Sequence, residues 1–365
     1  MSIFPGAYSV AVSRNSSSCR GIAGTMISPI RFKMRWLSEM PHAKKMSSRV
    51  TSQIRSTSAT CSGCGGESFS VVATGRDYIY HGTEDTFRYV RCGSCGHFYL
   101  NPRPDISQLS LMYPANYGTF SNRFQGRANI LGRIKTIVNR KRLKGVVARL
   151  PLRGRVLDVG CGNGELLIAL RQARPDLELF GLDWHFPAET RSALETQGIT
   201  MIEAPLEAAE LPVQPFDLII MLQLIEHLWE PEESLRRLVR GLAKDGRILI
   251  ETPNTDGWDR RLFADGAWGG YYFPRHLNLY NFERLAELLR RVGLAVESQR
   301  NLPAPLIWVY SLQGVVQASF GWKSFLTTLF GVKNLPLVAA FALLDSAAIA
   351  MGFMTSNQQT ISKKA

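Results

Sequence analysis

A glycine-rich turn is the first segment whose residue types and spacing could hold a ligand. The segment VLDVGCGNGELL, residues 156–167, joins a hydrophobic run to a helical pattern through Gly160, Gly162 and Gly164. Glycines let the backbone turn sharply and approach a ligand closely. The position of a dinucleotide site's third glycine holds Glu165, whose carboxylate would repel a pyrophosphate. The turn therefore disfavours a nicotinamide dinucleotide.

Two acidic residues accompany this turn. Asp158 precedes the first glycine, and Asp183 ends the next hydrophobic run in GLDWH. A carboxylate at the C-terminal edge of a strand can accept hydrogen bonds from both hydroxyls of a ribose. The unit consists of a strand, a D-x-G-x-G-x-G turn, a helix and a second strand that ends in an acid. This order of elements predicts a site for a ribose-containing cofactor.

Four of the six cysteines form two C-x-x-C pairs, CSGC and CGSC. Thiolates three residues apart on a tight turn converge on one ion, and two such turns complete a tetrahedral shell. In a chain of this length the pattern indicates metal binding in a reducing compartment before disulfides, with free thiols or a redox pair as alternatives. The predicted ligands of a structural zinc are Cys61, Cys64, Cys92 and Cys95.

Residues 145–302 resemble the class I S-adenosylmethionine-dependent methyltransferases. The resemblance rests on the glycine-rich unit and on FDLII, LIEHLWEPEESL, GLAKDGRILIETPN and PRHLNLYNFERLAELLRRVGL. The subgroup is similar to the "methyltransferase 23" type, whose N-terminal zinc-binding part the cysteine module followed by FYLNPRPD also resembles. The resemblance implies an α/β fold with a Rossmann-like seven-stranded sheet and helices on both faces.

The resemblance also implies which residues bind S-adenosylmethionine. The glycine-rich turn would hold the methionine and ribose part, and the acid that ends the second strand would bind the ribose. Where many members carry an acid for the adenine amine, this chain has Pro205, so a backbone group or Glu207 would serve. The predicted cofactor-binding residues are Asp158, Gly160, Cys161, Gly162, Gly164, Asp183 and Gln223.

Histidines at loop positions are candidates for proton removal from an acceptor. Methyl transfer to a hydroxyl requires alignment and a base, and imidazole titrates near neutral pH. We predict His276 as the base, with His227 and Glu226 as further catalytic candidates; a hydrogen-bonded loop histidine is the alternative for His276. The chain is also similar to the ubiquinone-pathway O-methyltransferases, whose Glu-x-x-Glu-His motif has Gln223 at its first position here.

Composition and periodicity divide the chain into segments. Alternating strand and helix patterns from residue 154 to 301 predict a parallel sheet, and apolar residues spaced by three and four predict a basic amphipathic helix at 129–150. The predicted segments are a leader at 1–59, a zinc-ribbon-like module at 60–105, a linker with the basic helix at 106–150, the core at 151–302, a hydrophobic helical insertion at 303–354 and a terminal edge strand at 355–365.

The leader is rich in serine and arginine and has no acidic residue before Glu39. That composition cannot bury a core, so we expect disorder. It resembles an organelle transit peptide and lacks the apolar run of a secretory signal. An over-long translation, with the true start at Met34, Met40 or Met46, explains the same composition.

The net charge of +13 is concentrated in two segments. Residues 1–60 hold nine Lys and Arg against one acid, and residues 106–157 hold eleven and no acid, so the remainder is 13 − 8 − 11 = −6. Only the second segment could form a basic face on the folded protein. Nucleic acid is therefore a poor candidate partner, and an anionic membrane surface is a better one.

The segment 303–354 is hydrophobic and contains a run of about 20 residues, LPLVAAFALLDSAAIAMGFM, with one charge at Asp345. That length suffices to span a bilayer, but the acid also suits a buried helix. A helical cap and a membrane-dipping hairpin beside the acceptor site are both consistent with the sequence.

Together these patterns predict an enzyme that transfers a methyl group from S-adenosylmethionine to a hydroxyl of a small-molecule, glycan or lipid-linked acceptor. RNA methylation and a non-catalytic cofactor-binding scaffold are the alternatives. We expect a cytoplasmic protein, with peripheral membrane association or organelle targeting as further locations.

Overall fold

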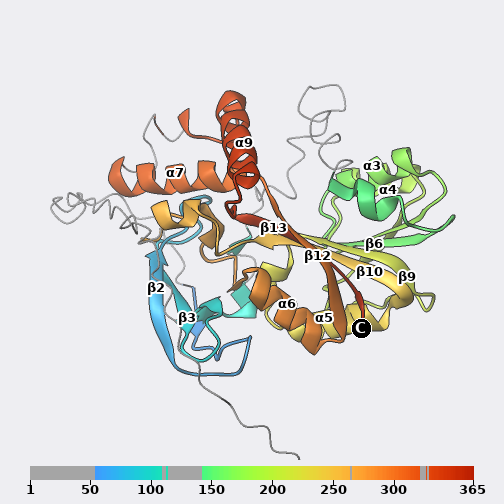
Figure 1. Ribbon diagram of the computed structural model, residues 1–365, viewed down its shortest axis with the longest axis horizontal. Helices are drawn as coiled ribbons and strands as arrows, with labels where there is room; N and C mark the ends of the chain where they lie inside the picture. The colour runs from blue at the N-terminus through green and yellow to red at the C-terminus, as the bar shows by residue number, and fades with distance from the viewer. Residues whose placement is uncertain (1–53, 109–111, 114–141, 264, 321–325, 327–328) are drawn as a thin grey trace, which may run out of the picture. The chain divides into compact units, whose positions relative to one another are not determined.

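The computed structural model describes residues 54–108, 112–113, 142–263, 265–320, 326 and 329–365. At its centre lies a seven-stranded sheet with the order β12-β13-β10-β9-β6-β7-β8 (Figure 1). The five strands from β10 to β8 are parallel, which confirms the predicted Rossmann-like α/β class. The strands are β6 Arg155–Val159, β7 Glu178–Asp183, β8 Thr200–Glu203, β9 Phe216–Leu222, β10 Leu242–Pro253, β12 Leu294–Leu302 and β13 Asn357–Lys364.

Helices cover both faces of this sheet (Figure 1). Alternate side chains of a strand point to opposite faces, so Val156 joins one apolar core and Leu157 the other. The helices α3 Glu165–Ala173 and α4 Ala188–Thr196 pack on the first core, and α5 Pro231–Arg240 and α6 Phe282–Arg291 on the second.

Local sequence signals explain where the second pair of helices begins. Pro231 occupies the first turn of α5, where its missing N–H leaves no hydrogen bond unmade. The Asn281 side chain caps α6 by accepting a hydrogen bond from the Arg284 N–H at 2.9 Å. Short 3-10 helices occupy Ile106–Gln108, Ile225–His227, Asp259–Leu262 and Gly269–Tyr271.

The C-terminal strand was predicted at the edge of the sheet, and that prediction is wrong. β13 is antiparallel to β10 on one side and to β12 on the other, so β12 is the edge strand. The prediction rested on the resemblance of SNQQTISKK to a strand that closes many class I methyltransferase sheets, but the amide side chains of this strand form hydrogen bonds inside the protein. Gln359 Nε2, for example, donates to Glu251 Oε1 at 2.6 Å.

The cysteine module is completed by a strand from the chain segment that also forms the seven-stranded sheet. A four-stranded sheet has the order β11-β4-β3-β2, and β11 pairs antiparallel with β4. The strands of this sheet are β2 Phe69–Gly75, β3 Phe87–Cys92, β4 Phe98–Leu100 and β11 Asn278–Leu279. The module and the core therefore share backbone hydrogen bonds and belong to one compact unit, residues 48–365.

Two predicted segments lie largely outside the described residues. The leader is described only from residue 54, where its end joins the fold: β1 Ser56–Thr57 pairs with β5 Arg103–Pro104, and Ile54 is buried. The leader boundary at 59 was therefore placed too late, because a two-residue polar strand has no sequence signature. Of the basic helix at 129–150, residues 142–147 are described and helical.

The hydrophobic C-terminal part forms two helices, α7 Pro305–Phe320 and α9 Leu335–Ala350 (Figure 1). The two pack through the stacked rings of Trp308 and Phe341, whose centroids are 5.1 Å apart. The Asp345 carboxylate is buried and accepts hydrogen bonds from the Ala304 N–H at 2.6 Å and the Trp308 Nε1–H at 3.0 Å. Within the described residues, no helix has both the length and the apolarity to cross a membrane.

A buried ion pair joins the module to the loop that follows β10. Asp77 accepts two hydrogen bonds from the Arg275 guanidinium, at 2.9 and 2.8 Å, and both side chains are almost completely buried. Burial alone would raise the pKa of Asp77, but the hydrogen bonds and charge of Arg275 hold that pKa below its usual value. Such a pair is costly to break because one charge is left without its partner.

We predict that Asp77→Asn lowers the free energy of unfolding by about 3–5 kcal/mol, because it removes the carboxylate that balances the charge of the buried guanidinium. The matched control is Asp176→Asn, which removes a similar two-point contact with Arg174 in a partly exposed setting. Urea unfolding of both variants measures the difference. Equal losses of stability would contradict the structural role assigned to the buried pair.

Candidate functional site

The glycine-rich turn follows β6 and leads directly into α3. Gly160, Gly162 and Gly164 all have positive φ, which residues with a side chain rarely adopt. A Cβ on Gly164 would lie 2.4 Å from Leu194, so this position also requires glycine for packing. The turn thus presents backbone rather than side chains at the carboxyl end of the central strand.

Asp183 ends β7 beside this turn. One carboxylate oxygen accepts a hydrogen bond from the Gly162 N–H at 2.8 Å, and the other accepts from the Trp184 N–H at 2.8 Å. Each oxygen keeps a second lone pair, which could accept a ribose hydroxyl. The carboxylate and the side-chain-free turn therefore form a cradle that fits the ribose and methionine part of S-adenosylmethionine.

The electrostatics around the turn are unusual because two carboxyl groups lie close together. Burial, and then the charge of Asp183, raise the pKa of Asp158 to about 8. Burial also raises the pKa of Asp183, although backbone hydrogen bonds oppose that shift. Near neutral pH, Asp158 is therefore mostly protonated in the protein as described.

Two predicted cofactor residues have side chains engaged elsewhere. Cys161 is buried in the core cluster that includes Leu167, so only its backbone belongs to the turn. Gln223 follows β9 with φ of 52°, and its side-chain amide donates to Asn357 Oδ1 at 3.1 Å. The predicted adenine contact Glu207 is exposed.

The three predicted catalytic residues converge at the carboxyl end of β9. Candidate ligand atoms of Glu226, His227 and His276 all lie within 4.8 Å of one another. The His276 Nε2 atom is 3.8 Å from Glu226 Oε1, and the two imidazole ring centroids are 4.7 Å apart. At least 48 residues lie between His276 and the pair Glu226 and His227. The only indication in the sequence that these residues are close was the expected loop position of His276.

Burial controls the protonation of this cluster. It raises the pKa of Glu226 to about 8, while a hydrogen bond from Thr252 opposes the shift. It lowers the pKa of His227 to about 4 and, together with the charge of His227, lowers that of His276 well below its usual value. Both imidazoles are therefore neutral near pH 7 and could accept a proton.

Side chains from the N-terminal module position the loop that carries His276. The Tyr89 hydroxyl donates to the His276 carbonyl and lies 3.0 Å from the Tyr271 carbonyl oxygen, and Asp77 holds Arg275. Sequence reasoning missed these residues. Their only signal is a tyrosine or aspartate in a β-rich module, and more than 180 residues separate them from the loop.

Aromatic side chains lie between the glycine-rich turn and the three catalytic candidates. The Tyr113 hydroxyl lies 2.9 Å from His227 Nδ1, and the Tyr113 ring centroid lies 6.5 Å from that of Trp184, next to Asp183. On the other side of the turn, a Cβ on Gly160 would lie 3.0 Å from Leu224, which precedes the 3-10 helix containing Glu226. The cofactor cradle and the catalytic candidates are therefore neighbours.

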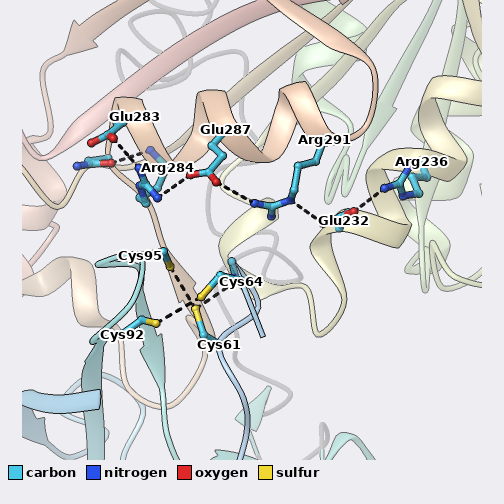
Figure 2. Close-up of polar contacts among 12 residues, drawn as sticks. Cys61, Cys64, Cys92, Cys95, Glu232, Arg236, Glu283, Arg284, Glu287 and Arg291 are labelled. Atoms are coloured by element: carbon cyan, nitrogen blue, oxygen red, sulfur yellow. Dashed lines mark hydrogen bonds and ion pairs between the residues drawn. The ribbon is translucent and has the colours of Figure 1, made fainter. Parts of the chain in front are cut away.

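The four predicted zinc ligands lie together beneath α6 (Figure 2). The Sγ atoms of Cys61 and Cys95 are 3.6 Å apart, and those of Cys64 and Cys92 are 3.5 Å apart. Four sulfurs at ~2.3 Å from a tetrahedral zinc would be separated by ~3.8 Å, so the arrangement fits the ion. All four positions come from protein, which fits a structural rather than a catalytic ion.

Charged side chains on α6 lie close to the cysteine cluster. Figure 2 shows Arg284 and Arg291 on the helix above the sulfurs, where Glu287 bridges them and Glu232 of α5 binds Arg291 at 2.8 Å. Ser62, between the first two cysteines, donates a hydrogen bond to Asn278 Oδ1 at 2.5 Å. The cysteine cluster is thus attached to the core at β11 and lies beside α6.

Residues 133–299 match the family model described as "Methyltransferase domain". A probable S-adenosylmethionine-dependent methyltransferase of Mycolicibacterium smegmatis is 28% identical over 145 residues, 39% of this chain and 52% of that protein. A ubiquinone biosynthesis O-methyltransferase of Coxiella burnetii is 28% identical over 142 residues, 37% of this chain and 60% of that protein.

A tRNA U34 carboxymethyltransferase of Syntrophotalea carbinolica is 33% identical over 113 residues, 29% of this chain and 35% of that protein. The chain spans between about a third and three fifths of the length of these curated relatives. The residues that match the family model, 133–299, include the glycine-rich turn, Asp183 and all three catalytic candidates.

We predict that the stability of the protein without ligand falls as pH rises, partly through Asp158. Its pKa in the folded state, about 8, exceeds the unfolded value near ~4, so its stabilising contribution is present at low pH and is lost as pH rises. Asp158→Asn should remove a slope of about 1.4 kcal/mol per pH unit between roughly pH 5 and pH 8. Urea unfolding at intervals across this range measures the slope; parallel profiles for variant and wild type would refute the prediction.

Proposed function

From the premise that residues 133–299 form a class I S-adenosylmethionine-dependent methyltransferase domain, we propose that the protein transfers the methyl group to a hydroxyl of a small-molecule, glycan or lipid-linked acceptor. One observation supports this most strongly. The carboxyl ends of β6, β7 and β9 bring the side-chain-free turn and Asp183 next to a cluster whose two imidazoles, those of His227 and His276, can accept a proton. Binding and proton removal are the two requirements of such a transfer.

The cofactor, when bound, supplies a methyl group that its sulfonium already activates. The residues of this chain then have two tasks. Asp183 and the turn hold the ribose and methionine part, and the cluster around His276 receives the proton of the acceptor hydroxyl. A neutral imidazole suits the second task because it carries a free lone pair at neutral pH.

RNA methylation is the rival enzyme function, and the described basic residues give it little support. Arg142 pairs with the buried Glu251 at 3.0 Å, and Arg155 pairs with Glu178 at 3.0 Å. These contacts neutralise two of the eleven Lys and Arg side chains of residues 106–157, so fewer positive charges remain to bind RNA phosphates. A scaffold that binds the cofactor without methyl transfer is the third candidate. Detection of methyl transfer would distinguish the proposed enzyme from such a scaffold.

We predict that Asp183→Ala weakens S-adenosylmethionine binding at least tenfold, because the ribose loses its acceptor. His276→Ala should leave that binding unchanged and reduce methyl transfer at least a hundredfold, the usual scale for loss of a proton acceptor. Calorimetry measures binding, and labelled cofactor with metabolite, lipid and RNA pools measures transfer. Asp176→Ala serves as the control at a partly exposed acidic residue.

Two results would count against this function. Wild-type affinity for the cofactor in Asp183→Ala would remove the assigned site. Full turnover in His276→Ala would remove the assigned proton acceptor, and transfer confined to the RNA pool would favour the rival function.

The cysteine cluster supports the further proposal that the module holds one structural zinc. The sulfur separations of 3.5 and 3.6 Å and the burial of Cys61 and Cys92 fit a closed thiolate site. Cys92→Ser should lower the zinc content by one ion per chain and destabilise the module, while Cys19→Ser, outside both pairs, retains it. Metal analysis with thermal unfolding checks this; unchanged zinc in Cys92→Ser rejects the site.

The exposed apolar residues in and after α9 support the proposal that the protein binds a lipid surface through this helix. Apart from the buried Asp345, the helix carries no charge, and Leu343 and Leu344 are exposed, as are Met351 and Phe353 just after it. A protein partner usually contacts one apolar stripe and leaves a polar opposite face, whereas α9 has no polar face. Its 16 residues are shorter than the ~20 needed to span a bilayer, so it would lie in the interface.

We predict that the wild type floats with neutral phosphatidylcholine vesicles and that high salt weakens this only slightly. Replacing Leu343 and Phe353 with Ser should reduce the bound fraction about tenfold or more, since each large apolar side chain contributes ~1.5–3 kcal/mol on burial. Val213→Ser, at a fully exposed valine elsewhere, is the control. Absence of the wild type from the floating fraction at both low and high salt would sink the lipid proposal.

A further inference from the structure

Asn278 joins three parts of the protein that are far apart in the sequence. It lies in β11, two residues after His276, and its side chain is almost completely buried. We propose that Asn278 is a positioning residue, which holds the backbone segments of His227 and His276 together and fixes both to the cysteine module. The proposal goes beyond the proposed methyl transfer but rests on it, because these two histidines are the candidate proton acceptors.

The hydrogen bonds of the Asn278 amide determine which way it faces. Its Nδ2 donates to the Leu228 carbonyl oxygen at 2.8 Å, and a carbonyl oxygen can only accept. The other end of the amide is therefore Oδ1, which accepts a hydrogen bond from the Ser62 hydroxyl at 2.5 Å. His97 Nε2 lies 3.4 Å from the same oxygen, so this nitrogen carries the proton of its ring. Both donors belong to the cysteine module, whereas Leu228 belongs to the core.

The segment around Asn278 also binds the short 3-10 helix that contains His227. Leu277 donates its N–H to the Glu226 carbonyl oxygen at 2.7 Å. Together with the contact to Leu228, this bond places one hydrogen bond on each side of His227. Contacts on both sides fix the position of a backbone segment, as a preorganised site requires.

The position of these segments determines which nitrogen of each imidazole is protonated. His276 Nδ1 lies 2.8 Å from the Gly270 carbonyl oxygen. His227 Nδ1 lies 3.1 Å from the Arg275 carbonyl oxygen, on the segment that Asn278 holds. A carbonyl oxygen accepts only, so each Nδ1 carries the proton and each Nε2 keeps a lone pair for the acceptor's proton. A shift of this segment would remove the constraint on His227.

An amide at this position is more demanding than an apolar side chain of similar size. A buried amide is costly unless it is hydrogen-bonded, whereas leucine carries no such cost. The amide instead joins elements that packing alone would not align, because Ser62 and Leu228 lie 216 and 50 residues from Asn278. Misplacement by about 1 Å can slow an enzyme about a hundredfold, so a link of this kind serves catalysis.

Nuclear magnetic resonance of the histidine side chains, in the full chain with isotope-labelled histidine, tests the proposal. At about pH 8, above the usual imidazole pKa of ~6.5, the spectrum shows which ring nitrogen carries the proton. In the wild type we expect the proton on Nδ1 of His227 and His276 and on Nε2 of His97. The measurement requires neither an acceptor nor turnover.

Two variants remove the link from its two ends. In Asn278→Ala, which lacks the amide, the proton of His227 and His276 should be distributed over both ring nitrogens. Methyl transfer should fall by about tenfold to a hundredfold, with the affinity for S-adenosylmethionine unchanged. Ser62→Ala removes only the donor on the module side and should cause a smaller change of the same kind. Ser62→Thr keeps the hydroxyl and should restore the wild-type spectrum.

The matched control is Asn281→Ala, which removes the cap of α6 three residues further along the chain. It should leave the signals of His227 and His276 unchanged. The exposed His185 is an internal reference, and its signal should be the same in every variant.

The proposal is overturned if His227 and His276 both keep the proton on Nδ1 in Asn278→Ala, or if Asn281→Ala changes their signals equally. Should Asn278→Ala fail to fold, Ser62→Ala decides: a change that Ser62→Thr reverses supports the proposal, and an unchanged spectrum overturns it. Because the spectra need no turnover, absence of methyl transfer in the wild type would count against the proposed function alone.

Discussion

The buried ion pair between Asp77 and Arg275 is the interaction on which the candidate site depends. It connects the β-rich module to the loop that carries His276, and both side chains are removed from water. The Tyr89 hydroxyl binds the same loop through the His276 carbonyl, and β11 continues the module's sheet immediately after the loop. The module is therefore part of the site's support and not a separate domain attached by a linker.

This support explains how a buried, electron-rich cluster can persist. Glu226 and the two imidazoles would favour a more solvated arrangement if their backbone were free to move, because buried polar groups without partners are costly. The loop holding His276 is fixed from the module side, and the 3-10 helix holding Glu226 is fixed by β9. Rigid elements on both sides keep the groups within reach of one another, as a binding or catalytic site requires.

Much of the fold could be predicted from the sequence because its signals are local. The D-x-G-x-G-x-G turn, the alternation of strands and helices and the two C-x-x-C pairs each specify their structure within a few residues. The position of β13 could not be predicted, because its pairing partners are set by contacts across more than 50 residues. The Asp77–Arg275 pair is equally non-local and has no spacing signature. His276 could be predicted as a candidate base from its loop position, but its distance from Glu226 could not.

The central claim is that the N-terminal module holds the loop at residues 271–277 in place. Hydrogen exchange of these backbone amides, before and after a chelator removes the proposed zinc, tests it directly, with the amides of β6 as the internal reference. The account predicts faster exchange at 271–277 after zinc removal and unchanged exchange in β6. Unchanged exchange at 271–277, in a protein shown to have lost its zinc, would contradict it.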